Sequence, residues 1–106
     1  MKKQVQENIN EICKEYYGQL VESLSEKPAY SCKPLRHCQA KVFDNGEYLI
    51  LQSYKTVVAF IVKRNSSFVD VLRLVYGFTS TSCQHIAKFR SDYGRNCVNY
   101  YTYRAV

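Results

Sequence analysis

The stretch HCQAKVFDNGEYLILQSYKTVVAFIVK, residues 37–63, decides the fold class. It contains runs rich in β-branched and aromatic residues, at 37–43, 47–54 and 55–63, and such runs are typical of strands. Asp44-Asn45-Gly46 separates the first two runs, and Asn and Gly tolerate the positive φ angles that a tight hairpin turn needs. The sequence therefore predicts antiparallel β-structure at the centre of the chain.

The other turns of this region are less sharply marked. The second and third runs meet at Ser53-Tyr54-Lys55, which contains no glycine, so either a turn or one long bent strand fits there. A further turn is predicted at residues 64–67, because Asn and Ser side chains hydrogen-bond readily to nearby backbone.

A long helix is predicted before the strands. Apolar residues fall at 5, 9, 12, 13, 16, 17, 20, 21 and 24, which places them on one broad face of a helix over residues 5–24. Pro28 ends this helix or follows its end closely. We expect the apolar face to pack on the protein's own sheet; the alternative is a helix that binds a partner or forms a homodimer. Residues 27–38, KPAYSCKPLRHC, hold both prolines of the chain and show no periodicity, so they are predicted to be an irregular connection.

Residues 68–76, FVDVLRLVY, fit two interpretations. Phe68, Val71, Leu72 and Val75 have helical spacing, whereas a short run of this composition before Gly77 also fits a strand buried on both faces. The strand is the favoured interpretation because of its composition.

A second helix is predicted over residues 82–93. Thr81 and Gln84 have the spacing of a capping box, and Gly94 is a plausible helix stop. Its inward face would hold Cys83, Ile86, Phe89 or Ala87, and Tyr93, and its outward face Gln84, His85, Lys88, Ser91 and Asp92. The β-rich run CVNYYTYRAV, residues 97–106, predicts a closing strand.

Together these elements predict a single α+β domain over residues 1–106. A long N-terminal helix packs on a mostly antiparallel sheet of four to five strands, and a second short helix precedes the last strand. The length and the 46% hydrophobic composition are those of one globular domain. No apolar run is long enough to cross a membrane, no apolar segment follows the first basic residues, and the five cysteines form no regular framework. A cytoplasmic protein with reduced thiols is expected.

Charge is distributed unevenly along the chain. Residues 1–27 carry four Lys and five Glu, net −1, whereas residues 28–106 carry eleven Lys or Arg and four Asp or Glu, net +7. Such an imbalance favours acidic or polyanionic partners.

Several polar residues are candidates for a site. Ser80 and Thr81, in a run of hydroxyl residues at the predicted helix start, could bind an anion, although capping is the commoner role of such residues. His85 could be a ligand or a general base, but it is predicted to be a surface histidine. Cys32, His37 and Cys38 offer metal-ligating atoms without the spacing of a zinc site, so neither a metal nor another cofactor is expected.

Basic and aromatic residues alternate near the C-terminus. Such a mixture resembles, in composition, a surface that binds single-stranded nucleic acid by stacking bases and pairing with phosphates. Tyrosine is also ordinary strand material, and no RNP-type motif is present. The candidate binding residues are Lys88, Arg90, Tyr93, Arg95, Tyr101, Tyr103 and Arg104.

The runs SYKTVVAFI, residues 53–61, and YGFTSTSCQHIAKF, residues 76–89, together resemble a family of uncharacterised small phage and mobile-element proteins of Firmicutes. That pattern is a Tyr-x-Thr-x-Val-Ala strand, then a strand that ends in a Gly-aromatic-Ser/Thr turn, then a helix with His-Ile-x-x-Phe. The resemblance implies a strand before Gly77. It also implies a compact accessory protein, among which inhibitors of host nucleic-acid-targeting defence are prominent.

Two functions are therefore expected. The first is a non-enzymatic inhibitor, of anti-CRISPR type, that acts in the host cytoplasm by binding a host defence protein. The alternative is a basic accessory protein that binds nucleic acid directly. The positive charge argues against simple DNA mimicry, and the sequence lacks paired carboxylates, phosphate loops and nucleophile motifs that would indicate an enzyme.

Overall fold

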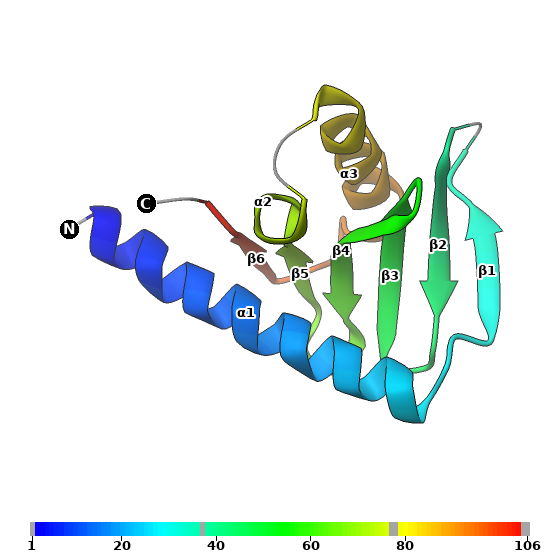
Figure 1. Ribbon diagram of the computed structural model, residues 1–106, viewed down its shortest axis with the longest axis horizontal. Coiled ribbons are helices and arrows are strands. Elements are labelled where there is room, and N and C mark those ends of the chain that lie inside the picture. Colours follow the sequence, from blue (N-terminus) through cyan, green and yellow to red (C-terminus); the bar gives the residue numbers. More distant parts are fainter. Residues whose placement is uncertain (1, 37, 77–78, 105–106) are drawn as a thin grey trace.

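The computed structural model describes residues 2–36, 38–76 and 79–104 (Figure 1). They form one six-stranded sheet with helices on both of its faces. The elements in chain order are α1 (Lys2–Glu26), β1 (Ser31–Pro34), β2 (Ala40–Asp44), β3 (Tyr48–Ser53), β4 (Thr56–Val62), a 3-10 turn η1 (Lys63–Asn65), β5 (Ser67–Asp70), α2 (Leu72–Val75), α3 (Ser80–Tyr93) and β6 (Asn99–Thr102). The predicted α+β class is confirmed, with more strands than the four to five expected.

The strands lie in the sheet in the order of the sequence, β1 to β6. Strands β1 to β5 are antiparallel to their neighbours, and only β6 is parallel, to β5. A parallel pair needs a crossover connection, which α2 and α3 provide here. This crossover places α3 beside the β3–β4 turn (Figure 1).

Side chains that alternate along each strand divide the core in two. Tyr48 and Ile50 of β3 pack with Cys13 and Leu20 of α1 on one face of the sheet. Leu51, on the other face, packs in a cluster with Ile86 and Phe89 of α3. Most of the apolar face of α1 is therefore covered by the protein's own sheet, as expected, whereas Val5 and Val21 of the predicted stripe are more than half exposed. The helix extends slightly beyond the predicted residues 5–24.

The hairpin turn at Asp44-Asn45-Gly46 is confirmed. Gly46 has a φ of 91°, a backbone conformation that residues with a Cβ rarely adopt. The Asn45 Oδ1 accepts hydrogen bonds from the backbone N–H groups of Glu47, at 3.0 Å, and Tyr48, at 2.9 Å. The turn therefore uses the two residues, Asn45 and Gly46, from which it was predicted. The turn predicted at residues 64–67 is also present, with Ser66 in the left-handed region.

The turn alternative at Ser53-Tyr54-Lys55 is the correct one, and its geometry is unusual. Tyr54 has a φ of 57°, although it is not a glycine. Just beyond the turn the register shifts, because Leu51 pairs with Ala59 whereas Gln52 pairs with Val57. Val58 is thus the extra residue of a β-bulge, a distortion that redirects side chains. The bulge turns Val58 toward the face that α3 covers.

The irregular connection predicted at residues 27–38 contains a strand, β1, so that prediction was wrong for this segment. β1 lies at the edge of the sheet, and most of its residues are exposed. An edge strand tolerates Pro34, whose missing N–H can face solvent, and it needs no alternating apolar pattern. The usual sequence signals of a strand are therefore absent.

Residues 68–76 are only partly the predicted strand. β5 ends at Asp70, and a helical turn, α2, follows it at Leu72–Val75. The Asp70 Oδ1 accepts a hydrogen bond from the Leu72 N–H at 3.0 Å, which supports the change of direction. The strand composition describes the first part of this run, which forms β5, and the helical spacing describes the second part, which forms α2.

Helix α3 begins two residues earlier than predicted, and the capping-box assignment of Thr81 was wrong. Thr79 is the N-cap residue, and its Oγ1 accepts a hydrogen bond from the Ser82 N–H at 3.1 Å. Gly94 follows the helix as expected. A Cβ at Gly94 would lie 2.9 Å from the Phe68 ring, so close packing favours glycine there.

Strand β6 confirms the closing strand predicted within residues 97–106, and it contacts α1. The Asn10 side chain donates to the Arg104 carbonyl at 2.6 Å and accepts from the Arg104 N–H at 3.0 Å. Two distant parts of the chain are thereby joined. None of the helices in residues 2–36, 38–76 and 79–104 has both the length and the apolar character that crossing a bilayer requires.

Candidate functional site

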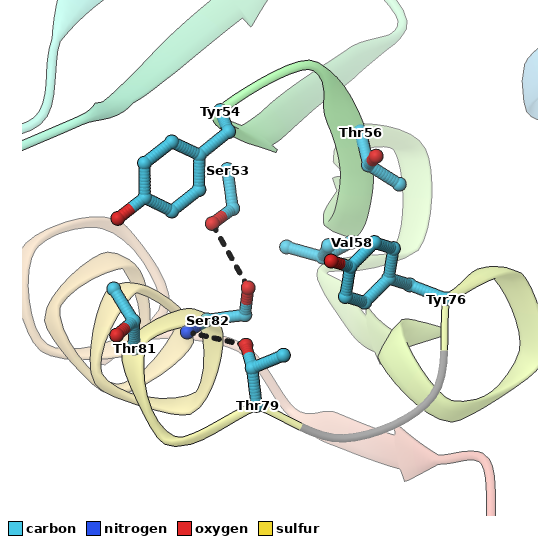
Figure 2. Close-up of a pocket in the computed structure, with 8 residues that line it drawn as sticks. All are labelled: Ser53, Tyr54, Thr56, Val58, Tyr76, Thr79, Thr81 and Ser82. Carbon is cyan, nitrogen blue, oxygen red and sulfur yellow. Dashed lines mark hydrogen bonds between the residues drawn. The ribbon is translucent and has the colours of Figure 1, made fainter.

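A pocket lies between the β3–β4 turn and the start of α3 (Figure 2). Its volume is about 230 Å³. We call it the hydroxyl pocket, because every described residue that lines it, except one, carries a hydroxyl group, and none of them is charged. It is lined by Ser53, Tyr54, Thr56, Val58, Tyr76, Thr79, Thr81 and Ser82.

A chain of buried hydrogen bonds forms one side of the hydroxyl pocket. The Ser53 Oγ lies 3.1 Å from the Ser82 Oγ and 2.7 Å from the Nδ1 of His85. All three residues are buried, with exposed fractions of 5% or less. Buried polar groups require partners, and here each supplies a partner to the next. The chain joins α3 to the end of β3.

The position of His85 corrects the expectation of a surface histidine. It is 3% exposed, and burial, followed by the nearby charge of Lys88, lowers the pKa of its imidazole below the ordinary value. His85 is thus neutral at pH 7, and its Nδ1 donates to or accepts from Ser53 according to the tautomer. Ser82, His85, Ile86 and Phe89 form the buried stripe of α3 at helical spacing. The helical spacing in the sequence fits this stripe, but the polarity of His85 predicts an outward position for that residue.

The Ser53–His85 contact also has the geometry of a nucleophile and its general base. In a hydrolase the base is usually oriented by a third group, commonly a carboxylate. Among residues 2–36, 38–76 and 79–104, no carboxylate forms a hydrogen bond with the His85 ring. Ser53 is buried and also bonded to Ser82, so the arrangement fits a structural hydrogen-bond chain.

The candidate anion-binding residues Ser80 and Thr81 do not lie together at this site. Thr81 lines the hydroxyl pocket, whereas Ser80 is exposed and does not line it. The Thr79 hydroxyl is occupied as the cap, and neither Lys88 nor Arg95 lines the pocket. An anion here would depend on helix amides alone, and anion binding by these residues stays a prediction.

A second, more open hollow lies on the other side of α3, against β6. Its volume is about 600 Å³. We call it the basic hollow, and it is lined by Cys83, Ile86, Ala87, Arg90, Ser91, Arg95 and Tyr100. The Arg90 guanidinium carbon lies 4.3 Å from the centre of the Tyr100 ring, which is a cation–π contact. The Tyr100 hydroxyl donates to the Gly94 carbonyl at 2.6 Å and fixes that ring in place.

The structure divides the predicted binding residues between two faces. Lys88, Arg90, Tyr93 and Arg95 lie on or just after α3. Tyr101 and Tyr103 pack in the cluster on the α1 face, where the Tyr101 ring stacks at 6.2 Å on that of Tyr16. The backbone of Arg104 is bonded to Asn10 of α1. The full set therefore forms no continuous surface, and of its members Arg90 and Arg95 line the basic hollow.

The cysteines are free thiols. Burial, and then the nearby charge of Asp70, raises the pKa of the Cys13 thiol to about 12, which keeps it protonated and unreactive. In the part of the chain that the structure describes, no three His, Cys, Asp or Glu side chains gather as metal ligands. His37, one member of the candidate trio with Cys32 and Cys38, lies outside the described residues.

Comparisons of the chain with protein-family models, with curated proteins and with solved structures gave no match.

Proposed function

We propose that this protein is a non-enzymatic binding protein of phage or mobile-element type that inhibits a host nucleic-acid-targeting defence system. It acts in the host cytoplasm by binding a defence protein through the basic hollow and the adjoining side chains of α3. The observation that carries the mode of action is the pair Arg90–Tyr100, with Arg95 beside it in an open hollow.

The charge of this surface selects an acidic partner. Arg90 and Arg95 line the hollow, and Lys88 adds a third cation on the same helix. Asp92, an acid near the end of this helix, is paired with Arg36 at 2.6 Å. Opposite charges steer association and fix orientation. Arginine and tyrosine are also enriched at the residues that dominate binding energy in protein interfaces.

The surface is also ordered before binding. The Arg90 guanidinium rests on the Tyr100 ring, and that ring is anchored at the Gly94 carbonyl. Ordering a long side chain at an interface costs about 0.5–1.5 kcal/mol, so a side chain that is already placed saves part of this cost. The biological setting of the proposal comes from the resemblance of residues 53–61 and 76–89 to small phage and mobile-element proteins.

Direct binding of nucleic acid is the alternative, since the same cations could contact phosphates. The arrangement of the tyrosines argues against base stacking. Arg90 covers a face of the Tyr100 ring, and Tyr101 stacks on Tyr16 of α1. Contacts between these cations and phosphates would then supply most of the binding free energy. Such contacts weaken as salt rises and support only weak, unspecific binding.

A plasmid-interference assay tests the proposal. Bacteria with an active CRISPR system are transformed with a targeted plasmid while they express the protein, and we expect the transformation frequency to rise above that of cells without the protein. The variant Lys88→Ala/Arg90→Ala/Arg95→Ala should lose this effect. The control Lys14→Ala/Lys33→Ala/Lys41→Ala removes the same charge from exposed positions elsewhere and should keep it.

Nucleic-acid binding is measured in parallel by fluorescence anisotropy with a labelled oligonucleotide at about 150 mM salt, a condition under which unspecific phosphate contacts are weak. We expect micromolar or weaker affinity. Nanomolar affinity that the α3 variant loses, without protection of the plasmid, would replace the inhibitor proposal with the alternative.

A further inference from the structure

We propose that the hydroxyl pocket binds a small neutral polyhydroxylated ring, about the size of one monosaccharide. This inference concerns a different surface from the basic hollow and does not depend on the inhibitor function. It rests on the charge, the free hydroxyl groups, the tyrosines at the rim and the size of the pocket.

The absence of charge in the lining selects a neutral ligand. None of the described residues that line the pocket is an Asp, Glu, Lys, Arg or His. Placing an ion in a pocket without a partner of opposite charge carries a desolvation penalty. A phosphate or carboxylate would therefore have to be held by the amides of α3 alone.

The hydroxyl groups of the pocket are available and suited to a ligand with hydroxyls of its own. In the described part of the chain, those of Thr56, Thr81 and Tyr76 form no hydrogen bond. A Ser, Thr or Tyr hydroxyl can both donate and accept, as can a hydroxyl of a sugar. A nucleobase presents a fixed pattern of donors and acceptors, which Asn, Gln or acidic side chains recognise, and the lining has none of these.

Apolar surfaces face the same pocket. Figure 2 shows the rings of Tyr54 and Tyr76 on opposite sides of the Ser53–Ser82 pair. The two residues are 58% and 63% exposed, and the centre of the Tyr54 ring also lies 5.7 Å from that of the His85 ring, which holds it at the rim. Val58, which the bulge directs here, adds an apolar wall. A ring with C–H faces and hydroxyl edges matches this combination of apolar and polar surface.

The size and the backbone geometry support a specific small site. The volume of about 230 Å³ is below the range of about 300–1,000 Å³ found for drug-sized ligands, which suits a single ring. The non-glycine residue Tyr54 is held at a φ of 57° at the edge of the pocket. Such strained residues cost about 1–3 kcal/mol and cluster at ligand sites.

The test is a titration followed by ¹⁵N–¹H correlation NMR of the full chain. The probes are methyl α-glucopyranoside, methyl α-galactopyranoside, methyl α-mannopyranoside and N-acetylglucosamine, each added to roughly 50 mM because ligands of this size bind weakly. We expect at least one of them to give saturable shifts at amides 53–58 and 79–82. Adenosine serves as the comparison for a flat base.

The variant Thr81→Val removes a free pocket hydroxyl while it keeps the shape of the side chain, and it should weaken that binding at least about fivefold, which is about 1 kcal/mol. The matched variant Thr102→Val on β6 should leave it unchanged. Saturable shifts from no sugar, shifts from adenosine alone, or equal affinity of the wild type and the Thr81→Val variant would each overturn the proposal.

Discussion

At the scale of the single residue, His85 shows how burial sets a protonation state. Its place between the sheet and α3 removes water from the imidazole, and the ring shares a hydrogen bond with Ser53. Burial favours the neutral form of the ring, and so does the positive charge of Lys88 nearby; together they lower the pKa of His85.

The lowered pKa of His85 predicts a pH dependence of stability. The unfolded chain takes up this proton near pH 6.5, whereas the folded protein takes it up only at lower pH, so the contribution is complete above pH 6.5 and is lost as the pH falls. We expect the free energy of unfolding, measured by urea titration, to decrease as the pH is lowered from 7.5 to 5.5. For one proton the slope is at most about 1.4 kcal/mol per pH unit.

The variant His85→Asn keeps a hydrogen-bond acceptor near Nδ1 but cannot titrate, so its stability should vary less over this interval. The variant His37→Asn reports the contribution of the other histidine. A slope that persists in His85→Asn and disappears in His37→Asn would contradict the assignment to His85.

Prediction from sequence succeeded at single residues where the chemistry is local. Asn45 Oδ1 and the positive φ of Gly46 form the turn within three residues, so the sequence predicts it. The Asn45 amide also donates to the Ser23 Oγ at 3.0 Å and to the Lys27 carbonyl at 3.2 Å, and these contacts with the end of α1 depend on the fold. The hydroxyl pocket brings Ser53 of β3 together with Ser82 and His85 of α3, across 29 and 32 residues. Nothing near Ser53 in the sequence indicates that pairing, because it follows from the crossover.

At the scale of the element, the start of α3 depends on one cap. Thr79→Ala should lower the free energy of unfolding by about 1 kcal/mol, because the Ser82 N–H loses its acceptor. Thr79→Ser should retain most of the stability. Thr81→Ala should change it by less than about 0.5 kcal/mol, as an exposed position without a cap contact does. Denaturant titrations in which Thr81→Ala costs as much as Thr79→Ala would place the helix start elsewhere.

The sequence predicted the elements that have a strong hydrophobic periodicity. It missed short or exposed elements, in which burial does not require such a pattern. The long apolar stripe identified α1, because most of one face of that helix packs on the sheet. β1 is an edge strand, and three of its four residues are exposed, so its sequence lacks the alternation of apolar and polar residues that predicts a strand. α2 is too short for a helical period to outweigh the β-rich composition of its neighbours.

At the scale of the whole molecule, the Asn10 side chain joins α1 to the C-terminal segment, because it bonds both backbone groups of Arg104. Asn10→Ala removes a donor and an acceptor from the Arg104 backbone, and we expect a loss of about 1–3 kcal/mol together with faster hydrogen exchange at the Arg104 amide. Asn8→Ala, at an exposed position of the same helix, should leave both quantities nearly unchanged. Equal effects of the two substitutions would show that the contact contributes nothing to closure.

The contact between α1 and β6 also has a consequence in time. Asn10 and Arg104 are 94 residues apart, and a ribosome adds about 5–20 residues per second, so roughly 5 to 20 s pass between their synthesis. During that interval the part of α1 that will meet β6 has no strand to cover it. In nascent chains of this protein, part of the apolar face of α1 should therefore stay uncovered. Chaperones that bind exposed apolar helix faces at the ribosome should raise the yield of folded protein more than they raise its free energy of unfolding.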